Sequence, residues 1–110
     1  MEINYKNNKL KKQLGSASEI KKAYGQHAKK LVARLSEMEA APNLGVLMQL
    51  PAANCHPLTG NRNGEWAVSI SSNHRLIFEI ANNSIPLKED GSIDTVLVVA
   101  ILLTGTEDYH

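Results

Sequence analysis

The first half of the chain has the hydrophobic periodicity of helices. Apolar residues recur at spacings of three and four over residues 18–41, so they line one face of a helix. Ser18 is the expected N-cap of this helix, and Pro42 ends it. Gly25 weakens the middle of the segment, because glycine is a poor helix former, and the helix is expected to divide there if it divides at all.

Two shorter helical segments flank this region. Asn7 or Asn8 can cap a brief helix that stops at Gly15, and residues 43–50 predict one more helical turn. Residues 2–5 favour a short opening strand. The first half is therefore expected to supply one strand and two to three helices.

The second half changes to the periodicity of strands. Residues 65–71 alternate between polar and apolar positions, with Trp66 on the apolar face, and residues 75–80 predict a second strand. Residues 82–94 are rich in turn formers and predict a loop or a splayed hairpin tip. Residues 96–103 are apolar on both faces, which predicts a central strand that is covered on both sides.

Helices followed by consecutive strands predict an α+β fold. We expect a small antiparallel (mixed) sheet of about four to five strands, with two to three N-terminal helices packed on one side. A chain of 110 residues can build a single hydrophobic core, so residues 1–110 are expected to form one domain. No apolar run approaches the ~20 residues of a membrane helix. The single cysteine excludes an internal disulfide, and a cytoplasmic location is expected.

Charge is distributed unevenly along the chain, although the net charge is only +1. Residues 1–34 hold nine basic and two acidic residues, whereas residues 35–110 hold three basic and nine acidic residues. Clustered lysines, including Lys29 and Lys30, are candidates for binding a polyanion. For charge alone, a solvated helix face is the simpler explanation.

Three groups of residues can carry chemistry. The first is a turn-rich segment that contains His56 and Arg62, and the second is an arginine, Arg75, at the start of a strand. The third is residues 108–110, Asp-Tyr-His. Imidazole titrates near neutral pH, and a guanidinium matches phosphate oxygens bidentately. Taken singly, each of these residues is more often structural than catalytic.

A metal site is not expected. His56, His74 and His110 show no ligand-type spacing, and the chain has no cysteine cluster. Cys55 and His56 do not form a nucleophile pair either, because adjacent residues of an extended chain point to opposite faces. Cys55 is expected to be a buried, small apolar side chain. We expect no cofactor.

Taken in order, the three groups resemble the HigB group of the RelE/ParE toxin superfamily, the toxin half of type II toxin–antitoxin modules. The matching segments are residues 56–66, 73–79 and 108–110, and the lysine-rich helices before the sheet agree in pattern. The resemblance implies a RelE/ParE-like fold. It also implies an enzyme, a ribosome-dependent endoribonuclease that cuts messenger RNA without a metal and so inhibits translation.

The resemblance further implies roles for the catalytic residues. A ribose 2′-hydroxyl would attack the adjacent phosphodiester, with His56 and His110 as the acid and base and Tyr109 assisting. Arg75 and Arg62 would hold and neutralise the phosphate, because a guanidinium stays charged.

Other positions imply weaker contacts with RNA. Asp108 would orient a neighbour or touch RNA, and Lys29 and Lys30 are candidate substrate-binding residues. Many relatives carry a lysine where this chain has Thr59 or Asn63, and some carry a basic residue where it has Ser69. The absence of these cations reduces phosphate stabilisation, by ~3 kcal/mol for each strong contact.

The expected partners are a HigA-like helix-turn-helix antitoxin, the ribosome and messenger RNA, with no membrane. One alternative is a non-catalytic inhibitor of DNA gyrase of the ParE type, since fold alone does not fix function. Another is a decayed toxin that only binds its antitoxin. Tyr109 and His110 favour the nuclease, because a gyrase inhibitor has no need of a proton-transfer pair.

Overall fold

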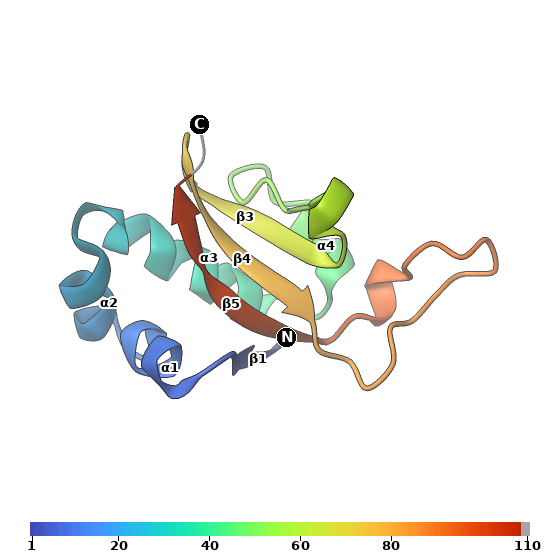
Figure 1. Ribbon diagram of the computed structural model, residues 1–110, viewed down its shortest axis with the longest axis horizontal. Coiled ribbons are helices and arrows are strands. Elements are labelled where there is room, and N and C mark those ends of the chain that lie inside the picture. The colour runs from blue at the N-terminus through green and yellow to red at the C-terminus, as the bar shows by residue number, and fades with distance from the viewer. Residues whose placement is uncertain (109–110) are drawn as a thin grey trace.

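A mixed five-stranded sheet forms the centre of the computed structural model, which describes residues 1–108 (Figure 1). Its strands are β1 (Glu2–Tyr5), β2 (His56–Pro57), β3 (Glu65–Ser71), β4 (His74–Ile80) and β5 (Ala100–Asp108). They lie in the order β1-β5-β4-β3-β2. β1 is parallel to β5, and every other neighbouring pair is antiparallel.

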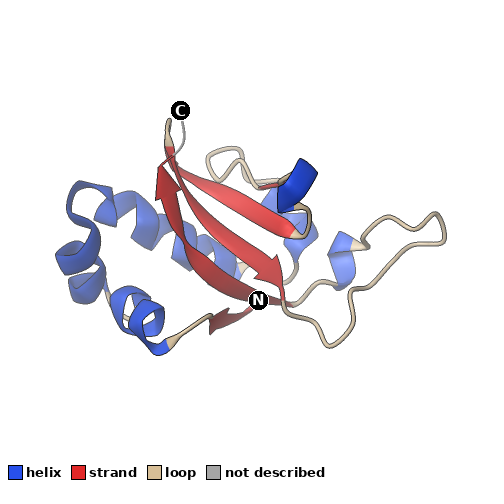
Figure 2. Ribbon diagram, in the orientation of Figure 1, coloured by secondary structure: helices blue, strands red, loops and turns tan. Residues whose placement is uncertain are grey.

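Helices cover one face of this sheet and leave the other face open (Figure 2). The α-helices are α1 (Asn8–Leu14), α2 (Ala17–Tyr24), α3 (Ala28–Ala40) and α4 (Leu44–Met48), and the short 3-10 turns are η1 (Gly25–His27), η2 (Gly60–Arg62) and η3 (Thr95–Leu97). The α+β prediction, with a mixed sheet and helices on one side, is confirmed.

The core lies between the sheet and the helices. Leu31 and Met38 of α3 are fully buried against the apolar face of β3, which carries Trp66, Val68 and Ile70 as predicted. The opposite face of the sheet holds only a small apolar cluster, made of Leu58, Ala67 and Ile77. The large buried side chains of β3 all lie on the side of the helices, which explains why β3 alternates so clearly in sequence.

The helical predictions hold with one correction. The long helical segment divides at Gly25, whose φ of +55° is readily adopted only by glycine. Asn7 caps α1, accepting a hydrogen bond from the Leu10 amide at 2.9 Å. The predicted cap Ser18 is wrong, because the helix begins earlier: Ser16 Oγ accepts the Glu19 amide at 3.2 Å.

The prediction of a covered strand over residues 96–103 is wrong in two respects. β5 starts only at Ala100, and residues 96–97 belong to η3, where both side chains are exposed. β5 is indeed an inner strand, but helices cover only one of its faces, so Leu103 is buried whereas Thr104 is partly exposed. The apolar run therefore covers two elements with different surroundings.

A β-bulge interrupts β5. Ile77 of β4 pairs with Gly105, but the next residue, Phe78, pairs with Leu103, so Thr104 is an extra residue. An extra residue reverses the alternation of faces for the rest of a strand. Glu107 therefore points to the open face, whereas uninterrupted alternation from Leu103 would direct it toward the helices.

Candidate functional site

Backbone register brings candidate residues together on the open face. Ser69, Arg75 and Glu107 lie directly opposite one another across β3, β4 and β5. In the adjacent row, His56 of β2 lies opposite Ala67. Residues opposite each other in paired strands point to the same side, so His56 and Arg75 share the open face.

The ring of His56 has a defined hydrogen bond. Its Nδ1 lies 2.7 Å from the backbone carbonyl oxygen of Asn54. A carbonyl oxygen can only accept, so Nδ1–H donates. Nε2 is therefore the ring nitrogen left for proton exchange with another group.

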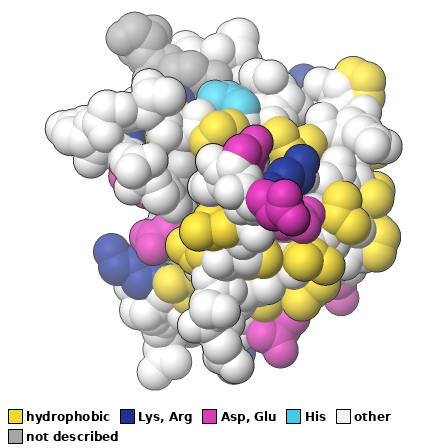
Figure 3. Space-filling view, turned by 90° about the vertical axis from the view of Figure 1, so that its right-hand side faces the viewer, with side chains coloured by type: hydrophobic (Ala, Val, Ile, Leu, Met, Phe, Trp, Pro, Cys, Tyr) yellow, Lys and Arg dark blue, Asp and Glu magenta, His cyan; other side chains and the backbone are white. Residues whose placement is uncertain are grey.

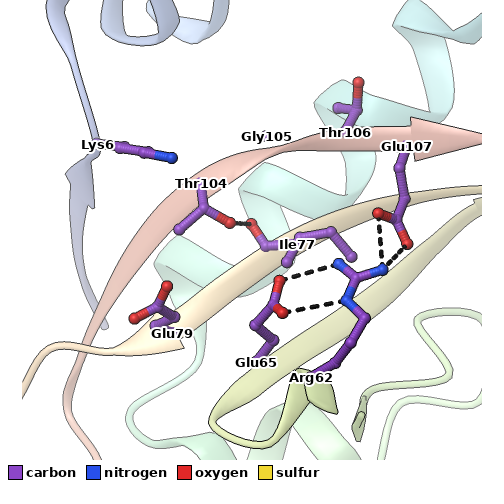
Figure 4. A pocket seen from close by; sticks show the side chains of 9 residues that line it. All are labelled: Lys6, Arg62, Glu65, Ile77, Glu79, Thr104, Gly105, Thr106 and Glu107. Atoms are coloured by element: carbon purple, nitrogen blue, oxygen red, sulfur yellow. Dashed lines mark hydrogen bonds and ion pairs between the residues drawn. The ribbon is translucent and has the colours of Figure 1, made fainter.

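Two arginines and two glutamates form an ion-pair network on the open face, which we name the Arg62–Glu107 cluster: Arg62, Glu65, Arg75 and Glu107. Arg62 lies between the two carboxylates (Figure 4). Its Nε and Nη2 donate to Glu65 at 3.1 and 2.9 Å, and its Nη1 donates to both oxygens of Glu107 at 2.7 and 2.9 Å.

The second arginine of the cluster also binds Glu107. Arg75 Nε donates to Glu107 Oε1 at 2.7 Å, and Arg75 Nη2 pairs with the same oxygen. The guanidinium is mostly buried, with 15% of its side chain exposed. Glu107 thus accepts from both of the arginines that the sequence identified as phosphate ligands.

Hydrogen bonds from Arg62 hold the carboxylates in their charged form. They are the largest cause of a lowered pKa for both Glu65 and Glu107, and Arg75 adds to the effect at Glu107. The same hydrogen bonds raise the pKa of Arg62. At neutral pH the cluster therefore holds two positive and two negative charges. Carboxylates occupy the guanidinium N–H groups that would otherwise bind phosphate.

Glu107 was not among the residues predicted from sequence. The sequence predicts the chemistry of the tail at residues 108–110. The available signal was Gly105, because glycine inside a strand often marks a bulge. Only the bulge directs Glu107 toward Arg75.

A hollow on the open face adjoins the cluster (Figure 4). Lys6, Glu79 and Thr104 contribute to its wall, and Lys6 enters from beyond the end of β1. Thr104 Oγ1 donates to the carbonyl oxygen of Ile77 at 3.2 Å, which holds the bulge against β4. The wall thus carries both signs of charge rather than a basic surface.

Lys29 and Lys30 lie elsewhere. Both are exposed on α3, and Lys29 lines a separate hollow with residues of α2, including Lys21. Since α3 packs on the covered face of the sheet, the structure does not bring these lysines together with Arg62 and Arg75.

The last described residue, Asp108, pairs with His74. The His74 ring stacks on His27 of η1, with centroids 4.4 Å apart and planes 8° apart, so this row faces the helices. Asp108 therefore does not share the face of Arg75. Tyr109 and His110 lie outside the described residues.

No group of three potential metal ligands occurs among His, Cys, Asp and Glu side chains of residues 1–108. Cys55 is buried as predicted, and burial raises the pKa of its thiol to about 12. Within the described part of the chain, no helix is long and apolar enough to cross a membrane.

Solved structures of bacterial toxins share this fold. A YoeB/ParE toxin from Agrobacterium tumefaciens aligns over 100% of both chains with a TM-score of 0.56 and 10% identity. YafQ from E. coli strain BL21(DE3) aligns over 97% of this chain and 91% of its own, with a TM-score of 0.50 and 14% identity. A point mutant of YafQ from E. coli aligns over 97% of this chain and 91% of its own, with a TM-score of 0.54 and 15% identity. At such identities the likeness shows the fold alone.

Sequence comparison identifies the family. None of the curated protein sequences matches the chain significantly. A family model described as the RelE-like toxin of the type II toxin–antitoxin system HigB matches residues 3–88. This segment runs from β1 through β4 and includes Arg62, Glu65 and Arg75. Because the match covers most of the 110 residues, this chain belongs to the HigB-like family of RelE-like type II toxins.

Proposed function

We propose that this toxin is a ribosome-dependent endoribonuclease that cleaves messenger RNA and so inhibits translation. RelE-like toxins are generally endoribonucleases. The observation that carries the proposal for this chain is the arrangement of the open face, where the Arg75 guanidinium and the His56 imidazole point to the same side. A guanidinium matches phosphate, and an imidazole can donate or accept a proton.

The proposed reaction needs no metal. A base removes the proton of a ribose 2′-hydroxyl, whose oxygen attacks the adjacent phosphorus, and an acid protonates the departing 5′-oxygen. His56 and His110 are the proposed acid and base, with Tyr109 assisting. Arg75 would stabilise the charge that develops on the phosphate oxygens.

The geometry supports different roles for the two arginines. Arg62 uses its Nε–Nη2 edge on Glu65 and its Nη1 on Glu107, so its role would be to position Glu107 rather than to grip phosphate. Arg75 donates to Glu107, and that carboxylate would leave when phosphate enters. Lys29, Lys30 and Asp108 would contact ribosomal or messenger RNA away from the scissile bond.

A type II toxin has an antitoxin partner. We propose that this partner is a HigA-like helix-turn-helix protein, that the ribosome presents the messenger RNA, and that the toxin acts in the cytoplasm. Lysines of α1 to α3 would supply the attraction to ribosomal RNA that the neutral open face lacks.

The charge balance of the Arg62–Glu107 cluster favours one second candidate function. With both guanidiniums engaged by carboxylates and Ser69 opposite Arg75, the face offers phosphate no excess positive charge. A toxin that retains antitoxin binding but has lost cleavage has this property. This second candidate is the decayed toxin, which only binds its antitoxin and which the sequence left open as an alternative.

Inducible expression in bacteria, followed by mapping of messenger RNA 5′ ends, tests the proposal. The wild type is expected to arrest growth and to create new ends inside translated messages. Arg75→Ala and His110→Ala should reduce the yield of these ends by about 100-fold, the usual effect of removing a group that stabilises developing charge or transfers a proton. Glu39→Ala, which also removes a charge but lies on the exposed surface of α3, is the matched control and should cleave like the wild type.

The other outcomes separate the alternatives. Growth arrest without new RNA ends contradicts the nuclease and directs attention to DNA gyrase. Absence of both arrest and cleavage, in a folded protein that still binds its antitoxin, supports the decayed toxin. Cleavage by His110→Ala at the wild-type level contradicts the role given to the tail.

A further inference from the structure

A second surface of this toxin is apolar although it is exposed. Among residues 1–108, the exposed large hydrophobic side chains fall into two segments, α4 and residues 85–99. We name them together the loop surface: Val46, Met48, Ile85, Leu87, Val96, Leu97 and Val99, with 37–63% of each residue exposed. On the face seen in Figure 3, hydrophobic side chains gather around a group of acidic ones, with a basic side chain beside them.

The two segments of the loop surface are continuous. The Leu44 amide of α4 donates to the carbonyl oxygen of Val98 at 3.0 Å. The neighbouring Gly45 lies so close to η3 that a Cβ there would come within 3.5 Å of Val96 Cγ2. Val46 and Met48 on α4 therefore adjoin the apolar residues around Val96.

Hydrogen bonds hold the loop in one shape. The Asn82 side chain donates to the carbonyl oxygen of Leu97 at 2.9 Å and accepts from the amides of Val99 and Ala100 at 3.1 and 3.2 Å. Farther out, Leu87 and Ile93 form a β-bridge. An ordered loop that exposes apolar side chains is a preformed docking surface, because little conformational entropy remains to be lost on binding.

Acidic residues border the loop surface and indicate the chemistry of its partner. Residues 82–99 contain Glu89, Asp90 and Asp94 and one basic residue, Lys88. Hydrogen bonds from Ser92 lower the pKa of Asp90, which is therefore ionised at neutral pH. A net acidic, apolar surface repels RNA phosphates, so its partner is a protein.

A second copy of this chain fits the loop surface poorly. In a twofold dimer the same surface meets itself, and Glu89 and Asp90 of one copy would lie against the same acids of the other. A segment with apolar side chains flanked by lysine or arginine satisfies both properties of the surface.

We propose that the loop surface docks the antitoxin, through an amphipathic segment whose apolar side chains are flanked by basic ones. The inference rests on the antitoxin partner of the proposed function and assigns the surface that partner uses. β5 separates this surface from Glu107 by seven residues, roughly 20 Å of strand. The antitoxin would therefore bind beside the Arg62–Glu107 cluster rather than on it, and would block the ribosome by its bulk.

Affinity measurements with purified toxin and the antitoxin of the same operon test this assignment. Leu87→Ser combined with Leu97→Ser removes exposed apolar contacts without touching the core, and should weaken binding at least tenfold by isothermal titration calorimetry. Glu89→Lys should weaken binding most strongly at low salt, and Glu39→Lys on exposed α3 is its matched control with wild-type affinity. Each variant, expressed without antitoxin, should arrest growth like the wild type.

Antitoxin affinities of the loop-surface variants within twofold of the wild type would overturn the proposal. It would also be overturned if the wild type were a dimer in light scattering that the variants dissociate, or if the variants lost co-sedimentation with ribosomes instead. Failure of the nuclease proposal is distinguishable, because RNA ends would then be absent while antitoxin binding stayed sensitive to the loop surface.

Discussion

Glu107 decides the charge of the open face. It accepts hydrogen bonds from Arg62 and Arg75, and its carboxylate lies where a phosphate would bind Arg75. A carboxylate and a phosphate oxygen offer the same acceptors to an arginine fork, so they compete. The proposed binding of RNA at Arg75 would therefore require Glu107 to be displaced.

Glu107→Gln should bind RNA more tightly than the wild type. The amide keeps the size of the side chain but removes one negative charge, which leaves the Arg62–Glu107 cluster with a net charge of +1. Fluorescence anisotropy with a short, 2′-O-methylated RNA measures affinity without cleavage. We expect a lower Kd and a salt dependence whose slope steepens by about 0.7, the value for one more phosphate contact with a single strand.

Glu79→Gln is the matched control for this measurement. It removes an equal charge from the wall of the same hollow, and no hydrogen bond joins Glu79 to either arginine among the contacts described above. A weaker affinity for Glu107→Gln than for Glu79→Gln would mean that Glu107 orients the arginines for RNA instead of competing with it.

Residue identity alone predicted part of this site. Arg75 and Arg62 stood out because guanidinium groups suit phosphate, and the structure brings them to one carboxylate. Glu107 was given no role in the site, because a glutamate near the end of a strand has no signature of its own. Its importance comes from pairing across strands, which links residues far apart in the chain.

At the scale of elements, the bulge in β5 connects sequence to site. Thr104 adds one residue to the strand, so the side chains beyond it change faces. The alternation of β3 was readable because its two faces differ in burial. In β5, apolar and small residues are mixed without a clear alternation. The sequence pattern therefore predicts neither the first residue of the strand nor its bulge.

Arg34 joins α3 to β3, and Arg34→Met should destabilise the fold. Its Nε donates to the carbonyl oxygen of Ser69 at 2.8 Å, next to an irregularity in the β3–β4 pairing, and the residue is 8% exposed. Methionine replaces the apolar stem but leaves that carbonyl without its charged donor. Urea denaturation should show a free energy of unfolding lower by about 2 kcal/mol.

Lys30→Met is the control for the Arg34 variant, because Lys30 is exposed on the same helix. Its free energy of unfolding should stay within about 0.5 kcal/mol of the wild type. Equal values for the two variants would show that the Arg34 hydrogen bond contributes nothing measurable.

Asn82→Ala should loosen the segment between β4 and β5. The substitution removes three hydrogen bonds, two of which protect the amides of Val99 and Ala100. Hydrogen–deuterium exchange should become faster at residues 95–100 and remain unchanged in β3. Asn83→Ala, at an exposed neighbouring position, should exchange like the wild type. Unchanged protection in Asn82→Ala would contradict a loop held by this side chain.

For the whole molecule, charge is separated between layers. The helical first third holds most of the lysines, whereas the remainder of the chain is acidic and its open face is balanced. A toxin of this kind would approach RNA through its helices, because screened attraction acts over about 10 Å before any specific contact forms.

Stability of the whole fold should decrease in acid through the Arg62–Glu107 cluster. The pKa values of Glu65 and Glu107 are lower in the folded chain than the ~4.3 of an unfolded glutamate. Their contribution is therefore complete above the unfolded pKa and is lost as pH falls through the folded pKa. Urea denaturation from pH 6 to pH 3 should show this loss.

Arg62→Gln should make the acid dependence shallower, because Arg62 is the largest cause of both lowered pKa values. Lys6→Gln is the control, since Lys6 lines the same hollow but forms no ion pair with Glu65 or Glu107 among residues 1–108. A pH dependence of Arg62→Gln as steep as that of the wild type would assign the loss to other carboxylates.

The sequence by itself determined the α+β class, the helical first half, Gly25 as the weak point of the long helical segment and the buried face of β3. Local periodicity and backbone preference carry that information. It also singled out Arg62 and Arg75 by their chemistry. Only the tertiary structure decided that Glu107 binds both arginines, that Asp108 lies on the other face and that residues 96–99 are exposed. Those properties depend on strand pairing, a one-residue bulge and the packing of distant segments, which no local pattern records.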